Sequence, residues 1–244
     1  MKDAPILVGC AGWAVPASAR DLFPVDGTLL QRYAAKLPAV EINSSFHRPH
    51  RPSTYARWAD SVPASFCFSV KVPKAITHEA RLIGTATLLD AFLGEVSALG
   101  PRLGCLLVQL PPSLTFDAAI ADAFFGVFRD GYAGMAALEP RHPTWFTSGA
   151  ERLLVAHRIA RVAADPARSL DAGEPGGSPD VIYYRLHGSP RVYYSAYDKP
   201  YLDRLAAKLR AHARAGTTTF CIFDNTVLGA ATLNALDVYT AVTS

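Results

Sequence analysis

The run Val181-Ile182-Tyr183-Tyr184-Arg185-Leu186-His187 is typical of a β-strand, because branched and aromatic residues dominate it. Its side chains alternate in kind: Ile182, Tyr184 and Leu186 share one face, whereas Arg185 and His187 share the other. In a barrel, one face of each strand packs against the surrounding helices and the other face lines the lumen. The apolar face must meet the helices, so Arg185 and His187 are predicted to point into a lumen, near its top.

Strands and helices alternate along the rest of the chain. Seven further strand-like runs occur at residues 6–10, 39–43, 66–71, 105–110, 135–139, 161–165 and 218–224. Amphipathic helical patterns occur at residues 29–37, 87–99, 118–128, 151–157, 201–215 and 230–242. This alternation predicts an α/β fold with a parallel sheet and right-handed crossovers. Eight such units predict one (β/α)8 barrel of the TIM type, a single domain over residues 1–244.

Two local patterns refine this fold. A doubly wound open sheet would need a glycine-rich phosphate loop after an early strand, and Gly9-Cys10-Ala11-Gly12-Trp13 does not match that pattern. A loop rich in glycine and proline, residues 171–179, stands where the sixth unit should have its helix. We therefore favour the barrel over the open sheet and expect its sixth unit to be degenerate.

The composition is that of a globular protein: 50% of the 244 residues are hydrophobic, 18% are charged, and the net charge is +3. So small a charge argues against nucleic acid or an anionic membrane as a partner. No apolar run approaches the roughly 18 residues of a membrane span, and the N-terminus lacks a secretion-signal pattern. The four cysteines show no C-x-x-C or zinc-ligand spacing, so we expect a protein of the reducing cytoplasm.

Polar residues recur at the last lumen-facing position of strand after strand. The alternation predicts inward side chains at Glu41, Asn43, Ser69, Lys71, Gln109 and Glu139, with Arg141 and His142 just beyond. The sixth strand ends in Asp165 and the eighth in Asp224-Asn225, either of which can be the inward residue. Earlier lumen positions are small or apolar, namely Cys67, Cys105, Ala137 and Ala163. An apolar base below charged strand ends is what the active site of a barrel requires.

Seven ordered motifs stand in the chain: VGCAGW at 8–13, VEINSSF at 40–46, FSVKVP at 68–73, ITH at 76–78, QLPPS at 109–113, LEPRHPTWF at 138–146 and YRLHG at 184–188. Through them the sequence resembles, nearly from end to end, the YecE-like family (DUF72) of bacterial and archaeal barrels. The resemblance implies a TIM-type barrel and supplies no substrate or reaction. The chain departs from the family pattern at Pro140, where phenylalanine is usual, and at residues 223–226, where the acidic residue stands two positions earlier.

Three carboxylates, those of Glu41, Glu139 and Asp165, are expected within one polar funnel. Two such groups can serve as general acid and general base when their neighbours separate their pKa values. The alternative is that each carboxylate is the counter-ion of a nearby arginine or lysine.

Cationic side chains gather at the same strand ends. Arg141 and Arg185, with His142 and His187, favour a small anionic ligand, because a guanidinium fits phosphate or carboxylate. His187 is the leading acid–base candidate, and its neighbour Arg185 is expected to lower its pKa and keep it neutral. Lys71 is a Schiff-base nucleophile if it is desolvated beside other cations, or else it pairs with Glu41 or Glu139.

The favoured hypothesis is a metal-independent enzyme, without a cofactor, that performs general acid–base chemistry on a small anionic, phosphorylated or sugar-like molecule. Its predicted catalytic residues are Glu41, Glu139, Asp165, His187 and Lys71. Its predicted substrate-binding residues are Asn43, Gln109, Arg141, His142, Arg185, Trp13 and Asn225. Phe46, His47 and Tyr193-Tyr194 are expected in loops on the same face, where aromatic rings can stack on a ligand.

Two other hypotheses stay open. A divalent-metal-dependent phosphoester hydrolase or nuclease would use Glu139, Asp165, His187 and Asp224 as ligands. A non-enzymatic binding module would use the same mouth as a pocket for a small molecule. The sequence indicates no oligomeric state.

Overall fold

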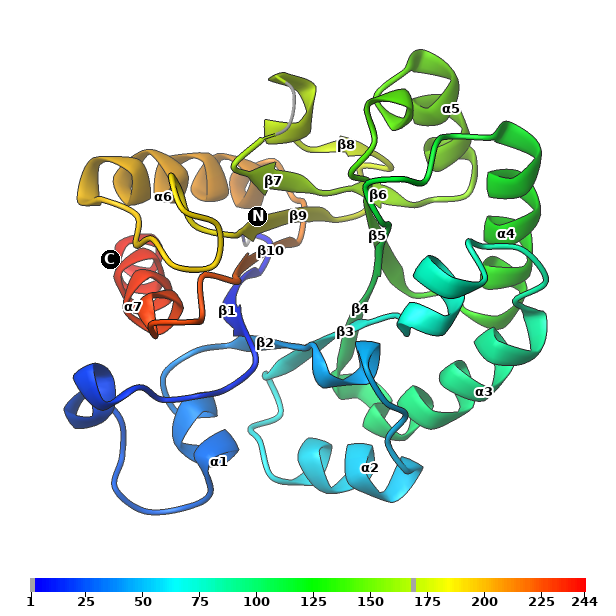
Figure 1. The fold of residues 1–244 in the computed structure, drawn as a ribbon. Coiled ribbons are helices and arrows are strands. Elements are labelled where there is room, and N and C mark those ends of the chain that lie inside the picture. Colours follow the sequence, from blue (N-terminus) through cyan, green and yellow to red (C-terminus); the bar gives the residue numbers. More distant parts are fainter. Residues whose placement is uncertain (1–2, 168–169) are drawn as a thin grey trace.

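One sheet of ten strands rolls into a nearly closed barrel, and helices surround it (Figure 1). The computed structural model describes residues 3–167 and 170–244. The strands are β1 (Ile6–Ala11), β2 (Ala39–Ile42), β3 (Cys67–Lys71), β4 (Leu103–Gln109), β5 (Met135–Glu139), β6 (Ala160–Arg161), β7 (Ala163–Asp165), β8 (Gly176–Gly177), β9 (Ile182–Leu186) and β10 (Thr219–Phe223). They follow the order β7-β9-β10-β1-β2-β3-β4-β5-β6-β8, and each pairing is parallel except that of β6 with β8.

Two strands that are consecutive in sequence, β6 and β7, lie near opposite ends of the strand order. β6 pairs with β5 and β7 pairs with β9, yet only Val162 separates β6 from β7. The predicted sixth strand, residues 161–165, is therefore present as two pieces: β7 is one edge of the sheet, and β6 lies next to the other edge, β8. This stretch brings the barrel nearly to closure.

Seven α-helices lie outside the barrel: α1 (Leu29–Ala34), α2 (Pro52–Asp60), α3 (Ala86–Val96), α4 (Ala118–Gly131), α5 (Ser148–Ala156), α6 (Lys199–Arg214) and α7 (Ala230–Thr243) in the described ranges. Six of them correspond to the predicted helical patterns. α2 was not predicted, since its nine residues carry few strong apolar positions; it begins at Pro52, a residue suited to a first helical turn. The sixth unit is degenerate, as expected: after β7, the described residues form a short 3-10 helix (Leu170–Gly173) and β8 in place of an α-helix.

Local interactions fix where several elements begin and how closely they pack. Thr28 and Gln31 form a capping box at the start of α1, and Asp117 caps α4. The Tyr33 hydroxyl of α1 donates to the carbonyl of Ala39 (3.0 Å), tying the helix to β2. Gly9 lets β1 lie close to β2, because a Cβ at this position would overlap the Ala39 carbonyl.

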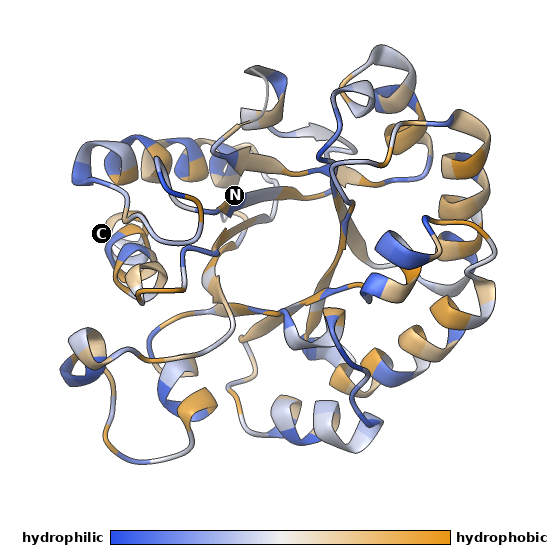
Figure 2. Ribbon diagram, in the orientation of Figure 1, coloured by the Kyte–Doolittle hydropathy of each residue, from blue (hydrophilic) through white to orange (hydrophobic). Residues whose placement is uncertain are grey.

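The barrel has an inner and an outer apolar layer. Figure 2 shows hydrophobic residues along the strands and mixed faces on the helices around them. The inner layer fills the lower lumen with, among others, Leu7, Cys105, Leu107, Ala137, Tyr183, Phe220 and Ile222. The rings of Tyr183 and Phe220 stack there, 5.5 Å apart. Because this base is filled, polar groups are confined to the carboxyl ends of the strands.

The structure decides one orientation that the sequence left open and corrects another. Phe220 and Ile222 line the lumen, so Asp224, which shares their side of β10, is the inward residue. Ala163 packs in the outer layer, whereas Val162 and Ala164 lie inside. The small alanine side chain fits on either side of a strand, so the pattern at residues 161–165 did not indicate which side chains point inward.

No helix in the described part of the chain is long and apolar enough to cross a bilayer.

Candidate active site at the carboxyl ends of the strands

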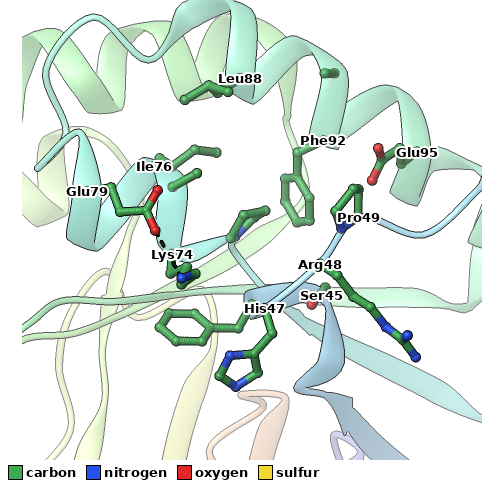
Figure 3. Close-up of a pocket in the computed structure, with 14 residues that line it drawn as sticks. Ser45, His47, Arg48, Pro49, Lys74, Ile76, Glu79, Leu88, Phe92 and Glu95 are labelled. Atoms are coloured by element: carbon green, nitrogen blue, oxygen red, sulfur yellow. Dashed lines mark ion pairs between the residues drawn. The ribbon is translucent and has the colours of Figure 1, made fainter.

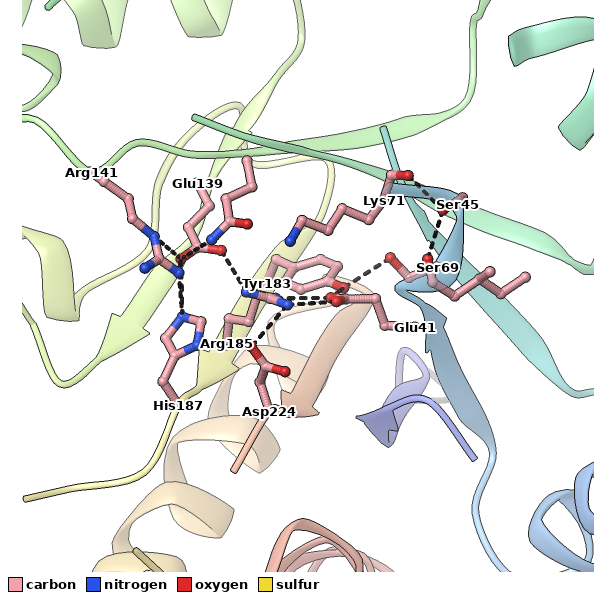
Figure 4. Close-up of polar contacts among 12 residues, drawn as sticks. Glu41, Ser45, Ser69, Lys71, Glu139, Arg141, Tyr183, Arg185, His187 and Asp224 are labelled. Carbon is pink, nitrogen blue, oxygen red and sulfur yellow. Dashed lines mark hydrogen bonds and ion pairs between the residues drawn. The ribbon is translucent and has the colours of Figure 1, made fainter. Parts of the chain in front are cut away.

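Arg185 on β9 is the centre of a buried charge cluster (Figure 4). Its Nε donates to Glu41 Oε2 (3.0 Å) and its Nη2 to Glu41 Oε1 (2.7 Å), a two-pronged contact. Its Nη1 donates to Glu139 Oε2 (3.0 Å), and Nη2 also lies 3.1 Å from Asp224 Oδ2. Arg185 is only 1% exposed. Its donors are thus directed at three carboxylates of the protein.

Glu139 at the end of β5 joins Arg185 to the upper part of the cluster. Its Oε1 accepts from Arg141 Nη2 (2.8 Å) and lies 3.0 Å from His187 Nε2. Gln109 Nε2 is a longer neighbour at 3.5 Å. Burial by itself would raise the pKa of Glu139, but Arg185, His187 and Arg141 outweigh it and hold that pKa well below its usual range. Glu139 is therefore an anion that orders its neighbours.

His187 lies between two carboxylates. Its Nε2 faces Glu139, and its Nδ1 lies 3.0 Å from Asp224 Oδ2. The two carboxylate acceptors favour hydrogen on both ring nitrogens, and hence the imidazolium, whereas Arg141 Nη2, 3.3 Å from Nε2, opposes it. Burial would lower the pKa of His187, but Glu139 and Asp224 outweigh it and raise that pKa. Arg185 does act to lower this pKa, as predicted, but the two carboxylates outweigh it, so the predicted net lowering is wrong.

The His187→Gln variant is expected to show this protonation state through its stability. A raised pKa in the folded protein means that the contribution of His187 is fully present below its unfolded pKa, about 6.5, and is lost as pH rises through the folded pKa. The difference in unfolding free energy between the parent and the variant should therefore be larger at pH 6 than at pH 9. Urea unfolding at both pH values measures it, and a difference that grows with pH would show a neutral ring instead.

Lys71 at the end of β3 stands apart from these ion pairs. Its Nζ lies 3.9 Å from the centroid of the Phe46 ring, and no residue in the described ranges forms an ion pair with it. Figure 4 shows the amine directed into the middle of the cluster. The predicted alternative, a pairing with Glu41 or Glu139, is wrong because Arg185 holds both carboxylates. Burial and the charge of Arg185 lower the pKa of Lys71 to about 8, against the opposing effect of the carboxylates.

A cavity of about 420 Å³ opens above the cluster, within the usual size range of small-molecule sites. Its lining includes Lys71, Asn43, Gln109, Arg141, Asp224, Phe46, His47, His78 and Tyr193. Asn43 Oδ1 is buried and has no hydrogen-bond donor among the described residues. Glu41 and Arg185 are absent from this lining and lie deeper in the lumen. A smaller recess of about 210 Å³ reaches Glu139, Arg141 and His187.

A second cavity, of about 390 Å³, lies on the outer side of the same loops (Figure 3). Apolar side chains such as Ile76, Leu88 and Phe92 line it, and Lys74 pairs with Glu79 at its edge (3.0 Å). Phe46 and His47 line both cavities and therefore form the wall between them.

Four predicted site residues lie outside the cluster. Asp165 faces outward beside Leu186 in the sheet register and accepts from the Tyr197 hydroxyl (2.8 Å), because the true alternation of β7 is opposite to the predicted one. His142 caps a short helix through Thr144. Trp13 packs against Trp58 with ring centroids 5.1 Å apart. Asn225 donates to Ser195 and Asn234, so Asp224 is the inward residue of the pair at the end of β10.

Two residues at the site had no predicted role. Tyr183 donates to Glu41 Oε2 (2.9 Å) and contacts Ser69 (2.8 Å); its place two residues before Arg185 on the same strand face was the available signal. His78 lines the cavity from the short helix Ala75–Glu79, where neither strand nor helix periodicity indicates a direction.

The predicted metal ligands are not assembled. Asp165 lies outward, and Glu139, His187 and Asp224 are bonded to one another or to Arg185. The described residues hold no group of three potential ligands arranged for a metal ion. The structure therefore does not bring the four predicted ligands together, and the hydrolase hypothesis stays a prediction.

The fold and the site define a class: α/β barrel proteins whose polar site lies at the carboxyl ends of parallel strands. Within this class, the family model described as "Protein of unknown function DUF72" matches residues 7–244, and the chain belongs to that family.

Individual relatives agree with this assignment. UPF0759 protein YecE of Escherichia coli (strain K12) is 31% identical over 177 residues, which are 70% of this chain and 62% of that relative. A DUF72 family protein of Thermotoga maritima has a similar crystal structure, with a TM-score of 0.79, 23% identity, and coverage of 98% of this chain and 99% of that one. Another from Enterococcus faecalis gives a TM-score of 0.77 at 21% identity over 100% of both chains. The structural matches bear on the fold alone.

Proposed function

We propose that the protein is an enzyme that performs general acid–base chemistry on a small anionic molecule in the cavity at the strand ends, with Lys71 as the group that exchanges the proton. The observation that carries this proposal is the position of the Lys71 amine. It lies at the cavity without a counter-ion among the described residues, whereas Arg141 and Arg185 beside it are bonded to carboxylates. A group held in this way is available to a ligand.

The neighbours of Lys71 suit it to acid–base work. A pKa of about 8 leaves roughly a tenth of the amine neutral at pH 7, so both protonation states are populated near neutrality. Positioned acids and bases with such values typically contribute about 10²–10⁴-fold to a rate. Glu41 and Glu139, predicted to transfer protons, are in this proposal positioning residues that hold Arg185 and His187.

The charge of the site favours an anion. With Lys71 and His187 protonated, the cluster and its rim hold four cationic groups against three carboxylates, which leaves one positive charge in excess. Arg141 uses Nε and Nη2 for Glu139 and is 14% exposed, so its remaining edge can meet a carboxylate or phosphate at the cavity. Asn43 and Gln109 offer amide groups on the same lining.

A ligand screen tests the proposal. Phosphorylated sugars and organic acids are added to the parent protein, and compounds that raise its melting temperature are then assayed for conversion. Arg141→Met is expected to abolish the thermal shift, and Lys71→Met to reduce turnover by about 10²–10⁴-fold. Lys74→Met is the matched control, since Lys74 lies on the second cavity in an exposed ion pair. Turnover that survives Lys71→Met unchanged would refute the assigned role.

Two finer features belong to this proposal. We infer that the barrel is of the (β/α)8 type, with β6 and β7 as one interrupted strand; the eight parallel segments so counted support it.

We also propose a reducing compartment such as the cytoplasm, which four free cysteines support.

A further inference from the structure

We propose that Lys71 forms a covalent imine with aldehydes or ketones that carry an anionic group, so that the substrates of this site are small carbonyl acids or carbonyl phosphates. This inference rests on the proposed function, because it assigns a substrate class to the same cavity. Its basis is a buried amine at a cavity wall, held by a rigid strand and facing an aromatic ring in place of a carboxylate.

The backbone of Lys71 is fixed. The residue ends β3, and its carbonyl accepts from the Ser45 hydroxyl (2.7 Å), which also donates to Ile42 (2.9 Å). The residue is 6% exposed and lines the cavity, so most of its stem packs inside the protein. Such a nucleophile approaches a bound carbonyl from one direction, which is how positioning raises the rate of an addition.

The surroundings also favour the neutral amine that addition requires. Burial and the like charge of Arg185 favour the neutral amine, and they outweigh the carboxylates of the cluster, which favour the ammonium as the cation–π contact with the Phe46 ring does. Desolvation next to another cation is a recognised way to activate a lysine for imine formation. A reactive lysine and a strand-end anion site therefore meet in one cavity.

The step is balanced without any oxidant or cofactor. The nitrogen lone pair forms a bond to the carbonyl carbon, and the carbonyl π electrons move to oxygen. One proton passes from nitrogen to that oxygen, giving a carbinolamine. A second proton, taken from solvent, lets the hydroxyl leave as water while the nitrogen lone pair forms the C=N bond. The products are a protonated imine on Lys71 and one water molecule.

The anionic group of the substrate would be bound by Arg141. Arg141 lines the same cavity as Lys71 and is anchored by two hydrogen bonds to Glu139. The cationic imine and the guanidinium would then lie on either side of a substrate whose carbonyl neighbours a carboxylate or phosphate. A neutral carbonyl compound would lack the second contact.

Reductive trapping tests the imine. The parent protein is incubated at pH 8 with glyoxylate and sodium cyanoborohydride, and each lysine is quantified by peptide mass spectrometry. The adduct is expected at Lys71 at least about tenfold faster than at other lysines, since at pH 8 a lysine of ordinary pKa is less than one hundredth neutral. Arg141→Met should slow labelling by glyoxylate but not by acetaldehyde, and Lys74→Met should change neither.

The outcomes separate the two proposals. Adducts spread over exposed lysines such as Lys199, with no preference for Lys71, would overturn the imine. If Lys71→Met also left turnover unchanged, the proposed function would fail with it; if the variant abolished turnover while no adduct formed, acid–base catalysis would stand alone. Preferential reduction at Lys71 that Arg141→Met slows for glyoxylate alone would support both the imine and its anionic substrate class.

Discussion

The Arg185→Met variant is expected to lose about 3–5 kcal/mol of unfolding free energy at pH 7, the largest effect of any substitution in the cluster. Methionine removes the donors that face Glu41, Glu139 and Asp224 and leaves Glu41, which is 0% exposed, without its counter-ion. Removing one partner of a buried ion pair is costly because the remaining charge stays desolvated. Urea unfolding measured by circular dichroism gives the free energy and, through its slope, the compactness of the variant.

Arg141→Met is the control for this prediction. Arg141 contacts Glu139 alone among the carboxylates of the described residues and is partly exposed, so its loss should be clearly smaller. The defect of Arg185→Met should also shrink as pH falls toward 5, because protonation of the abandoned carboxylates relieves it. Equal losses in the two arginine variants would mean that Arg185 does not organise the site.

The Lys71→Met variant is expected to be more stable than the parent at pH 7, by on the order of 1–3 kcal/mol, while its turnover is lost. The folded pKa of about 8 is below the unfolded value near 10.4, so the unfolded chain binds more protons between these values. This lysine therefore makes parental stability rise with pH from about 8 to about 10.4, and the penalty is constant below 8. The advantage of the variant should fade over the same interval.

Unfolding free energies of both proteins at pH 7 and pH 10 measure this effect. Lys74→Met, which removes an exposed ion pair, should shift stability by no more than about 1 kcal/mol. A Lys71→Met protein less stable than the parent at pH 7 would identify Lys71 as a structural cation. Stability gained together with activity lost is the signature expected of a group retained for function.

Alternation along single strands predicted much of the site. Arg185 lies between Tyr184 and Leu186, and Glu41 lies between Val40 and Ile42, so only one orientation buries the apolar neighbours against helices. The same reasoning failed where neighbours are uninformative, as with Asp165 after two alanines. It left the choice between Asp224 and Asn225 open, because the lower lumen, where Phe220 and Ile222 lie, is as apolar as the outside of the barrel.

Partners across the barrel could not be predicted. Arg185 bonds to Glu41, which is 144 residues away in sequence, and this pairing depends on the register of the whole sheet. The protonation of His187 was therefore misjudged from its sequence neighbour Arg185, although Glu139 and Asp224 decide it. For the same reason, the isolation of Lys71 emerged only from the structure.

In this protein a buried scaffold of paired charges surrounds one reactive amine, and the pKa of that amine is the most direct measure of this division. Protein labelled with ¹³C-lysine is titrated from pH 6 to pH 11 and followed by NMR, with the Lys71 Cε resonance assigned by its absence in Lys71→Met. A midpoint at about 8 is the predicted result. A midpoint near 10.4, the value of an ordinary solvated or paired lysine, would contradict the assignment of Lys71 as a reactive amine.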